Sequence, residues 1–281
     1  MEYLGADRRP GPTELAHSGL TRPRFSWPPF VVRSAIPLAA TTLLLGLWEL
    51  GVRLEVVDAL HFPAPSTIAR TTWRLTQEGV LTRHLAATAS RVAWSVLIGG
   101  SAGLLLGVAM GRSARLRAAV DPFVAALHPV PKIAILPLIM VIFGIGDVSL
   151  VIVIATGAFF PMLITTMTGV AQINPIHDDV ARLHRASTAR VMFRVVLPAS
   201  APSVLAGLRL ALNTALLITI AVEMVAARTG LGSMIWLGWT TLRTEEIYVA
   251  LAMTILFGLA VNLVISAITY FALPWQRGGE A

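Results

Sequence analysis

The chain has 281 residues, of which 56% are hydrophobic and only 13% charged, and its mean hydropathy is +0.74. Soluble domains carry about 25% charged residues, so this chain has too little polar surface to fold with water on every side. The composition therefore predicts an all-α integral membrane protein whose apolar side chains face lipid.

The charged residues exclude two function classes. The chain has 22 basic residues, of which 21 are arginines and one, Lys132, is a lysine. The arginines lie between apolar stretches and form no patch, which favours membrane orientation over nucleic-acid binding. Lys132 lies in Pro131-Lys132-Ile133 and not in the Gly-Lys-Ser/Thr of a phosphate-binding P-loop. We therefore expect ATP hydrolysis, if it is needed, on another subunit.

No catalytic, metal-binding or cofactor-binding residue set is apparent. The chain has no cysteine, which excludes disulfides and thiolate chemistry. Its six histidines are scattered, without metal-ligand spacing. We expect no enzymatic activity and no cofactor on this chain.

Hydropathy divides the chain into a tail, a membrane domain and a short end. Residues 1–30 are polar and proline-rich, which predicts a disordered cytoplasmic tail. Residues 31–275 hold six apolar stretches close to the ~20 residues that cross a bilayer, and residues 276–281 form a cytoplasmic end. The six stretches are residues 31–52, 92–111, 122–146, 148–177, 204–227 and 247–276.

The arginines set the orientation of these six predicted spans. With an even number of spans both termini lie on one side. That side carries thirteen arginines: Arg8, Arg9, Arg22, Arg24, Arg33, Arg112, Arg115, Arg117, Arg182, Arg185, Arg190, Arg194 and Arg277. The other side carries six: Arg53, Arg70, Arg74, Arg83, Arg228 and Arg243. The excess predicts that both termini are cytoplasmic.

Two connections between the predicted spans are long. Residues 54–82 are predicted to be external, with Ser66 capping a short helix that carries Ile68 and Leu75 on one face. Residues 171–201 are predicted to be cytoplasmic and to form two short amphipathic helices. Pro198 and Pro202 are expected to end the second of these helices before the fifth span.

Residues 171–201 allow two interpretations from their physics. A basic amphipathic hairpin suits anionic lipid headgroups. An apolar stripe flanked by charge also suits docking of a soluble cytoplasmic partner.

Sequence motifs decide between the interpretations of this loop. The run from Asp179 to Ser187, continued by Val195-Val196-Leu197-Pro198, resembles the "EAA" loop of permease subunits in binding-protein-dependent ABC importers. The resemblance extends in order over roughly residues 60 to 275. It is nearest to the branch that imports sulfonates, taurine, nitrate and pyrimidine precursors. Its further motifs are Phe62-Pro63-Ala64-Pro65-Ser66, His128-Pro129-Val130-Pro131-Lys132, Gly207-Leu208-Arg209, Glu223-Met224 and Gly230-Leu231-Gly232.

The resemblance implies a type I importer permease in the bacterial inner membrane. Its expected partners are a cytoplasmic ATP-binding subunit, an extracytoplasmic solute-binding protein, a second permease copy in a homodimer, and membrane lipid. Arg185 stands where the family usually has glycine. The residues implied in ATPase coupling are Asp179, Val180, Ala181, Leu183, Arg185, Ala186, Ser187 and Pro198.

Three polar residues in the predicted spans are candidates for the solute pathway or its gate. Glu223 is either such a residue or a hydrogen-bonded structural carboxylate near the external end. Lys132 either snorkels to the cytoplasmic interface or attracts an anionic solute. Asn213 lines a pathway or forms an interhelical hydrogen bond, as do Asn262 and Ser266.

The glycines of the second span predict packing and not chemistry. They recur every four residues, which indicates close approach of another helix. The spaced glycines are Gly99, Gly103, Gly107 and Gly111.

Two rival functions are considered. A secondary transporter would need no ATPase, but we see no internal repeat and few buried charges. An integral membrane enzyme would need a reactive cluster, and none is apparent.

Overall fold

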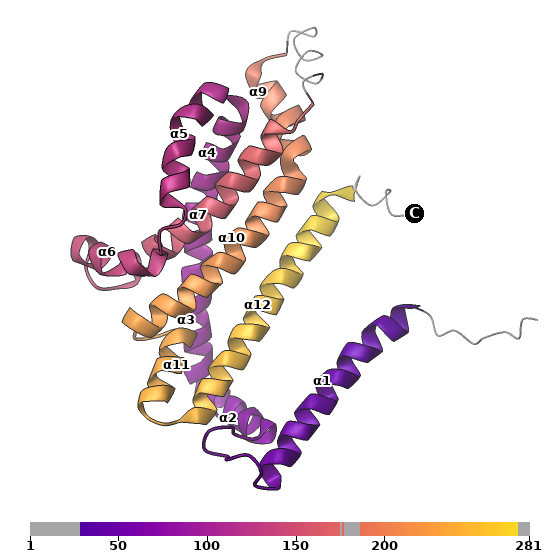
Figure 1. Ribbon diagram of the computed structural model, residues 1–281, viewed down its shortest axis with the longest axis vertical. Coiled ribbons are helices and arrows are strands. Elements are labelled where there is room, and N and C mark those ends of the chain that lie inside the picture. The colour runs from indigo at the N-terminus through magenta and orange to yellow at the C-terminus, as the bar shows by residue number, and fades with distance from the viewer. Residues whose placement is uncertain (1–28, 175, 177–185, 275–281) are drawn as a thin grey trace, which may run out of the picture. The chain divides into compact units, whose positions relative to one another are not determined.

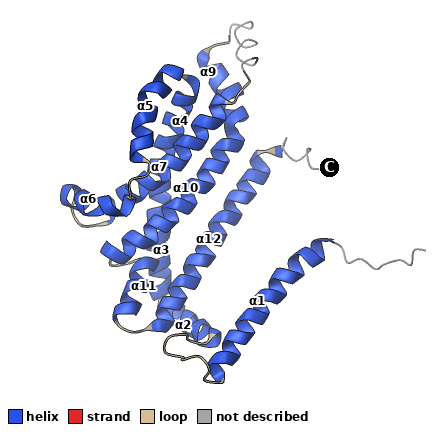
Figure 2. Ribbon diagram, viewed as in Figure 1, coloured by secondary structure: helices blue, strands red, loops and turns tan. Residues whose placement is uncertain are grey.

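The computed structural model describes residues 29–174, 176 and 186–274, and every regular element in these ranges is helical (Figure 2). The chain divides into two compact units, residues 1–50 and 51–281. Residues 29–50 of helix α1 (Pro29–Arg53) are the described part of the first unit. The remaining described helices belong to the second unit.

Four of the described helical segments are long and apolar enough to cross a membrane, or five if one bent pair counts as a span. The prediction of an all-α membrane protein is thus confirmed, whereas six spans and cytoplasmic termini stay predictions. The four segments are α3–η1–α4 (Val80–Arg112), α7 (Asp147–Ala171), α9–η3–α10 (Thr188–Ala226) and α12 (Thr244–Ala272).

Helix α7 is the core of the second unit. It packs against α4 (Ser101–Arg112) on one side and α10 (Leu197–Ala226) on the other (Figure 1). In its most apolar stretch 56% of α7 is buried, against 6% for α12. Apolar side chains of α7 such as Leu150, Ile154 and Leu163 are fully enclosed. Within the second unit α12 is therefore much less enclosed than α7.

The predicted glycine stripe lies where α4 and its preceding turn meet α7. A Cβ added at Gly99 would collide with the carbonyl oxygen of Ala155, and one at Gly103 with that of Phe159. At Gly107 and Gly111 the obstacles are again backbone and side chains of α7. The interpretation of this stripe as close helix packing is confirmed.

The third apolar stretch is not one straight helix. α5 (Ala114–Leu127) is followed by the 3-10 turn η2 (Lys132–Ile135) and α6 (Leu136–Phe143), and the two halves are bent by 87°. Pro129 and Pro131 lie at the bend, where neither can donate a backbone hydrogen bond. The sequence prediction placed residues 122–146 in one span whose helix is broken by prolines, and the structure shows a sharp bend there.

The prediction that Pro198 and Pro202 end the loop helix is wrong. α9 (Thr188–Val191), the π-helical turn η3 (Met192–Val196) and α10 run on as one helix. In η3 the Leu197 N–H donates to the Met192 carbonyl, five residues back. The wider turn places a proline at the start of α10 without a break. The Ser200 hydroxyl donates to the Val196 carbonyl at 2.8 Å.

The connection after α1 contains the predicted amphipathic helix, with a different start. α2 (Pro65–Gln77) begins at Pro65, and its N-cap is Ala64. Ser66 is therefore inside the first turn, and the prediction that it caps the helix is wrong. Proline suits the first helical position because its missing N–H would have no partner there. Leu75 is buried, and α2 packs against α12.

Candidate functional site

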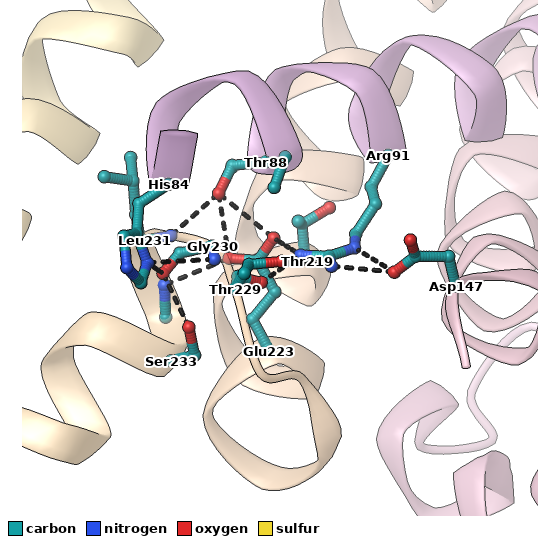
Figure 3. Close-up of polar contacts among 12 residues, drawn as sticks. His84, Thr88, Arg91, Asp147, Thr219, Glu223, Thr229, Gly230, Leu231 and Ser233 are labelled. Carbon is teal, nitrogen blue, oxygen red and sulfur yellow. Dashed lines mark hydrogen bonds and ion pairs between the residues drawn. The ribbon is translucent and has the colours of Figure 1, made fainter. Parts of the chain in front are cut away.

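A cluster of polar side chains joins α3, α7 and α10 at the end of the second unit that holds α11 (Leu231–Thr240) (Figure 3). α3 (Val80–Ser95) supplies Thr88 and Arg91, one turn apart, and both are buried. Glu223 faces them from the last turn of α10 and is fully buried. We call His84, Thr88, Arg91, Asp147, Glu223 and the 229–233 turn the Glu223 cluster.

Glu223 has hydrogen-bond donors on three sides. The Arg91 Nη1 group donates to its Oε1 at 2.6 Å, and the Thr88 hydroxyl lies 2.9 Å from its Oε2. The Gly232 N–H donates to Oε2 at 3.0 Å. A buried carboxylate is tolerated when it is paired and its lone pairs are satisfied. The contacts place Glu223 as a structural tie between α3 and the turn after α10.

Arg91 joins a buried carboxylate to an exposed one. Its Nε and Nη2 groups donate to Asp147 Oδ1 at 3.0 and 2.7 Å, while Nη1 reaches Glu223. The Asp147 side chain is 74% exposed, against 0% for Glu223. Nη1 also donates to the Thr229 carbonyl. The fixed fork of arginine thus holds the first turn of α7 and the end of α10 together.

The turn after α10 is shaped by this cluster. Gly230 has a φ of +131°, and a Cβ there would collide with the Glu223 carboxylate. Only glycine therefore fits this position without strain. The Leu231 N–H donates to the Thr88 hydroxyl at 2.8 Å, and the Gly230 N–H lies 3.1 Å from His84 Nδ1.

A pocket of about 410 Å³ opens beside the cluster. Its polar walls are Arg91, Asp147, Arg228 and Thr229, and its other walls come from the start of α7 and the end of α10. The remaining lining residues are Ile145, Gly146, Leu150, Ala226 and Ala227.

Asn213 lies elsewhere, on the face of α10 that meets α12. Its Oδ1 accepts a hydrogen bond from Asn262 Nδ2 at 3.1 Å. One turn earlier, Arg209 Nη2 donates to the Ser266 hydroxyl at 2.7 Å. Asn213 therefore forms an interhelical hydrogen bond, as one of its two interpretations predicts. Its role in a solute pathway stays a prediction.

Lys132 lies at the bend between α5 and η2. Its Nζ donates to the carbonyls of Leu127, His128 and Val130 at 2.8 to 2.9 Å, and it lies 4.4 Å from the centre of the Phe160 ring. The ammonium group thus satisfies carbonyls left free where α5 ends. Its predicted role in attracting solute stays a prediction.

The predicted coupling loop is described only in part. Asp179, Val180, Ala181, Leu183 and Arg185 lie outside the described residues. Ser187 accepts a hydrogen bond from the Arg190 N–H at 3.4 Å and so caps α9. Ala186 directly precedes this cap, and Pro198 lies in the first turn of α10.

The partners of Glu223 were not among the residues predicted from the sequence. Arg91 and Asp147 each directly precede an uncharged apolar stretch, on what is predicted to be the same external side as Glu223. Charged residues at the ends of two spans can pair with a carboxylate near the same end of a third span. That expectation would have predicted this cluster.

Comparison with known proteins places the chain in a family. It is 28% identical to the taurine transport system permease protein TauC of Escherichia coli, over 94% of this chain and 96% of that protein. It is 30% identical to the nitrate import permease protein NrtB of Leptolyngbya laminosa, over 88% and 90%.

A solved structure of the methionine ABC transporter MetNI in an inward-facing conformation shares the fold. The TM-score is 0.56 at 20% identity, over 66% of this chain and 91% of that one. The family model of the binding-protein-dependent transport system inner membrane component matches residues 99–278. The chain is therefore a multi-pass inner-membrane permease of the aliphatic sulfonate, taurine and nitrate branch of ABC importers, and belongs to the family of binding-protein-dependent transport system inner membrane components.

Proposed function

We propose that this chain forms, as a homodimer, the membrane pathway of an ATP-driven importer for a small anionic or zwitterionic solute. Taurine, another sulfonate and nitrate are the first solutes to test, because two relatives are a taurine and a nitrate permease. A separate ATPase drives transport, and an external binding protein delivers the solute. Each copy has six spans with both termini in the cytoplasm.

The continuous helix from Thr188 to Ala226 carries this proposal. It has 39 residues, or about 58 Å at ~1.5 Å per residue. Its first residues, 188–201, are the second half of the proposed coupling loop, residues 171–201. The other end holds Glu223, which is bonded to α3 and to the turn before α11. Movement of the loop by the ATPase would therefore be transmitted along one helix to the opposite end of the bundle.

Co-purification and uptake test the proposal. Leu183→Asp places a charge on the face of the coupling loop that the sequence predicts to be apolar, so we expect loss of ATPase co-purification and of ATP-dependent uptake. Arg115→Asp is the matched control, because Arg115 is an exposed residue of α5 outside the loop. Retention of the ATPase and of uptake by Leu183→Asp would contradict coupling through the loop. ATP-independent uptake by the permease alone would instead indicate a secondary transporter.

A further inference from the structure

Arg209 is a cation inside a membrane-spanning helix. It lies 14 residues before Glu223 on α10, about 21 Å along the helix axis at ~1.5 Å per residue. Its side chain is exposed on this chain. Within the described residues no carboxylate forms an ion pair with it. Arginine within a membrane span is costly, so its guanidinium calls for a polar partner or a ligand.

Most of the guanidinium's hydrogen-bonding capacity is unused among the described residues. An arginine has five N–H donors, and one Nη2 donor reaches the Ser266 hydroxyl at 2.7 Å. Ser266 donates its own proton to the Asn262 carbonyl at 2.8 Å, so it acts on Arg209 only as an acceptor. Ser266 therefore positions the guanidinium and leaves its remaining donors for a ligand.

A second donor group lies one turn along the same face of α10. Asn213 is four residues after Arg209, so the two side chains share a face. Its Oδ1 is used by Asn262 Nδ2 at 3.1 Å, and Asn262 is held by the Gly258 carbonyl at 2.9 Å. The orientation leaves the Asn213 Nδ2 group as a further donor. The site offers several donors and a positive charge without a carboxylate.

We propose that Arg209 and Asn213, positioned by Ser266 and Asn262, bind an oxyanion. The planar guanidinium fork matches two oxygens of a sulfonate, nitrate or phosphodiester. The oxyanion comes either from the transported solute or from an anionic lipid headgroup beside α10 and α12. The solute source rests on the proposed function.

The test uses the complete complex of permease, ATPase and binding protein in vesicles of two compositions. One is pure phosphatidylcholine, and the other contains phosphatidylglycerol as well. The readouts are uptake of taurine, methanesulfonate and nitrate, and ATP hydrolysis stimulated by the loaded binding protein. The variants are Arg209→Gln, which removes both the charge and the guanidinium fork, and Arg209→Lys, which keeps the charge and removes the fork. Arg115→Gln is the control, since it removes an exposed arginine of α5.

The outcomes separate the two sources. If the solute is the ligand, Arg209→Gln lowers uptake about tenfold or more in pure phosphatidylcholine while stimulated ATP hydrolysis remains. If a headgroup is the ligand, phosphatidylglycerol raises wild-type uptake and Arg209→Gln abolishes that increase. If Arg209→Gln matches the wild type and Arg115→Gln in both vesicles, the site is overturned. If the wild-type complex shows no stimulated hydrolysis, the proposed function fails instead.

The positioning role of Ser266 has its own readout. Ser266→Ala should lower uptake, or the response to phosphatidylglycerol, about threefold without changing the denaturation midpoint, and Ser266→Thr should restore it. Should Arg209→Gln fail to assemble, Arg209→Lys and Ser266→Ala provide the same comparison. Wild-type behaviour of both would overturn the proposal.

Discussion

At the scale of single residues, the Glu223 cluster shows how this chain keeps charge in an apolar interior. Glu223 is enclosed, yet Arg91, Thr88 and the Gly232 amide all donate to it. Breaking a buried ion pair by removing one partner leaves an uncompensated charge, at a cost of about 3–5 kcal/mol. The cluster therefore links the stability of α3, α10 and the following turn.

Neutralising Glu223 should destabilise the protein. Glu223→Gln places an amide group against hydrogen-bond donors and removes the buried carboxylate that pairs with Arg91, so we expect a loss of about 3 kcal/mol in free energy of unfolding. The measurement is the denaturation midpoint of the solubilised permease. Glu78→Gln, at the exposed end of α2, is the control. An unchanged midpoint for Glu223→Gln would show that the ion pair contributes no stability.

Gly230 provides a second test of the same cluster. Gly230→Ala meets both an unfavourable φ of +131° and the Glu223 carboxylate. Gly144 has a φ of +84°, and among the described residues nothing lies within 4 Å of an added Cβ. We expect Gly144→Ala to cost about 1–3 kcal/mol, because its backbone conformation is essentially restricted to glycine. Gly230→Ala should cost more, by an overpacking penalty of about 1–3 kcal/mol. Equal midpoints for the two variants would exclude the collision.

At the scale of elements, α4 and α7 meet through backbone and small side chains. Such contact depends on glycine because a side chain would separate the helices. Gly99 and Gly100 are neighbours in η1 (Val96–Gly100), and both are buried. Their surroundings differ: an added Cβ at Gly100 makes ordinary contact with Val96 at 3.5 Å, whereas one at Gly99 runs into the Ala155 backbone.

This pair of glycines gives a matched comparison. Gly100→Ala should be neutral or stabilising by about 0.5–1 kcal/mol, because alanine loses less entropy in a helix. Gly99→Ala should destabilise by about 1–3 kcal/mol through overpacking. Thermal unfolding of the two variants in the same detergent measures the difference. Similar stability would contradict the close packing of this turn on α7.

At the scale of the whole molecule, the topology is open to direct labelling because the chain has no cysteine. A single introduced cysteine is then the only thiol. Thr76 and Thr188 are exposed at the end of α2 and in α9, and the arginine distribution predicts that they face opposite sides of the membrane.

Labelling should separate these two positions. We expect an impermeant maleimide to label Thr76→Cys in intact spheroplasts and Thr188→Cys only after lysis. Ser18→Cys, in the predicted cytoplasmic tail, should behave like Thr188→Cys. Labelling of Thr76→Cys and Thr188→Cys from the same side would refute the predicted orientation.

The apolar stretches could be predicted because hydropathy is a local property of the sequence. The course of the helices between them was harder to predict. Pro198 signals a helix end, but the π turn at Met192–Val196 lets the helix continue. The pairing of Arg91 with Glu223 spans 132 residues, and no local pattern encodes it. Close packing at the glycine stripe could be predicted because a four-residue spacing places the glycines on one face of a helix.

The contrast between α7 and α12 determines where the molecule can deform. α7 is in close contact with α4 on one side and α10 on the other, and the glycines bring α4 and α7 close enough to oppose sliding. α12 buries 6% of its apolar stretch, so its seam with α10 is the compliant one. Spin labels on α4 and α10 should keep a fixed spacing through the ATP cycle. The distance between labels on α10 and α12 should change during each cycle of ATP hydrolysis, and its changes would therefore mark each transport turnover.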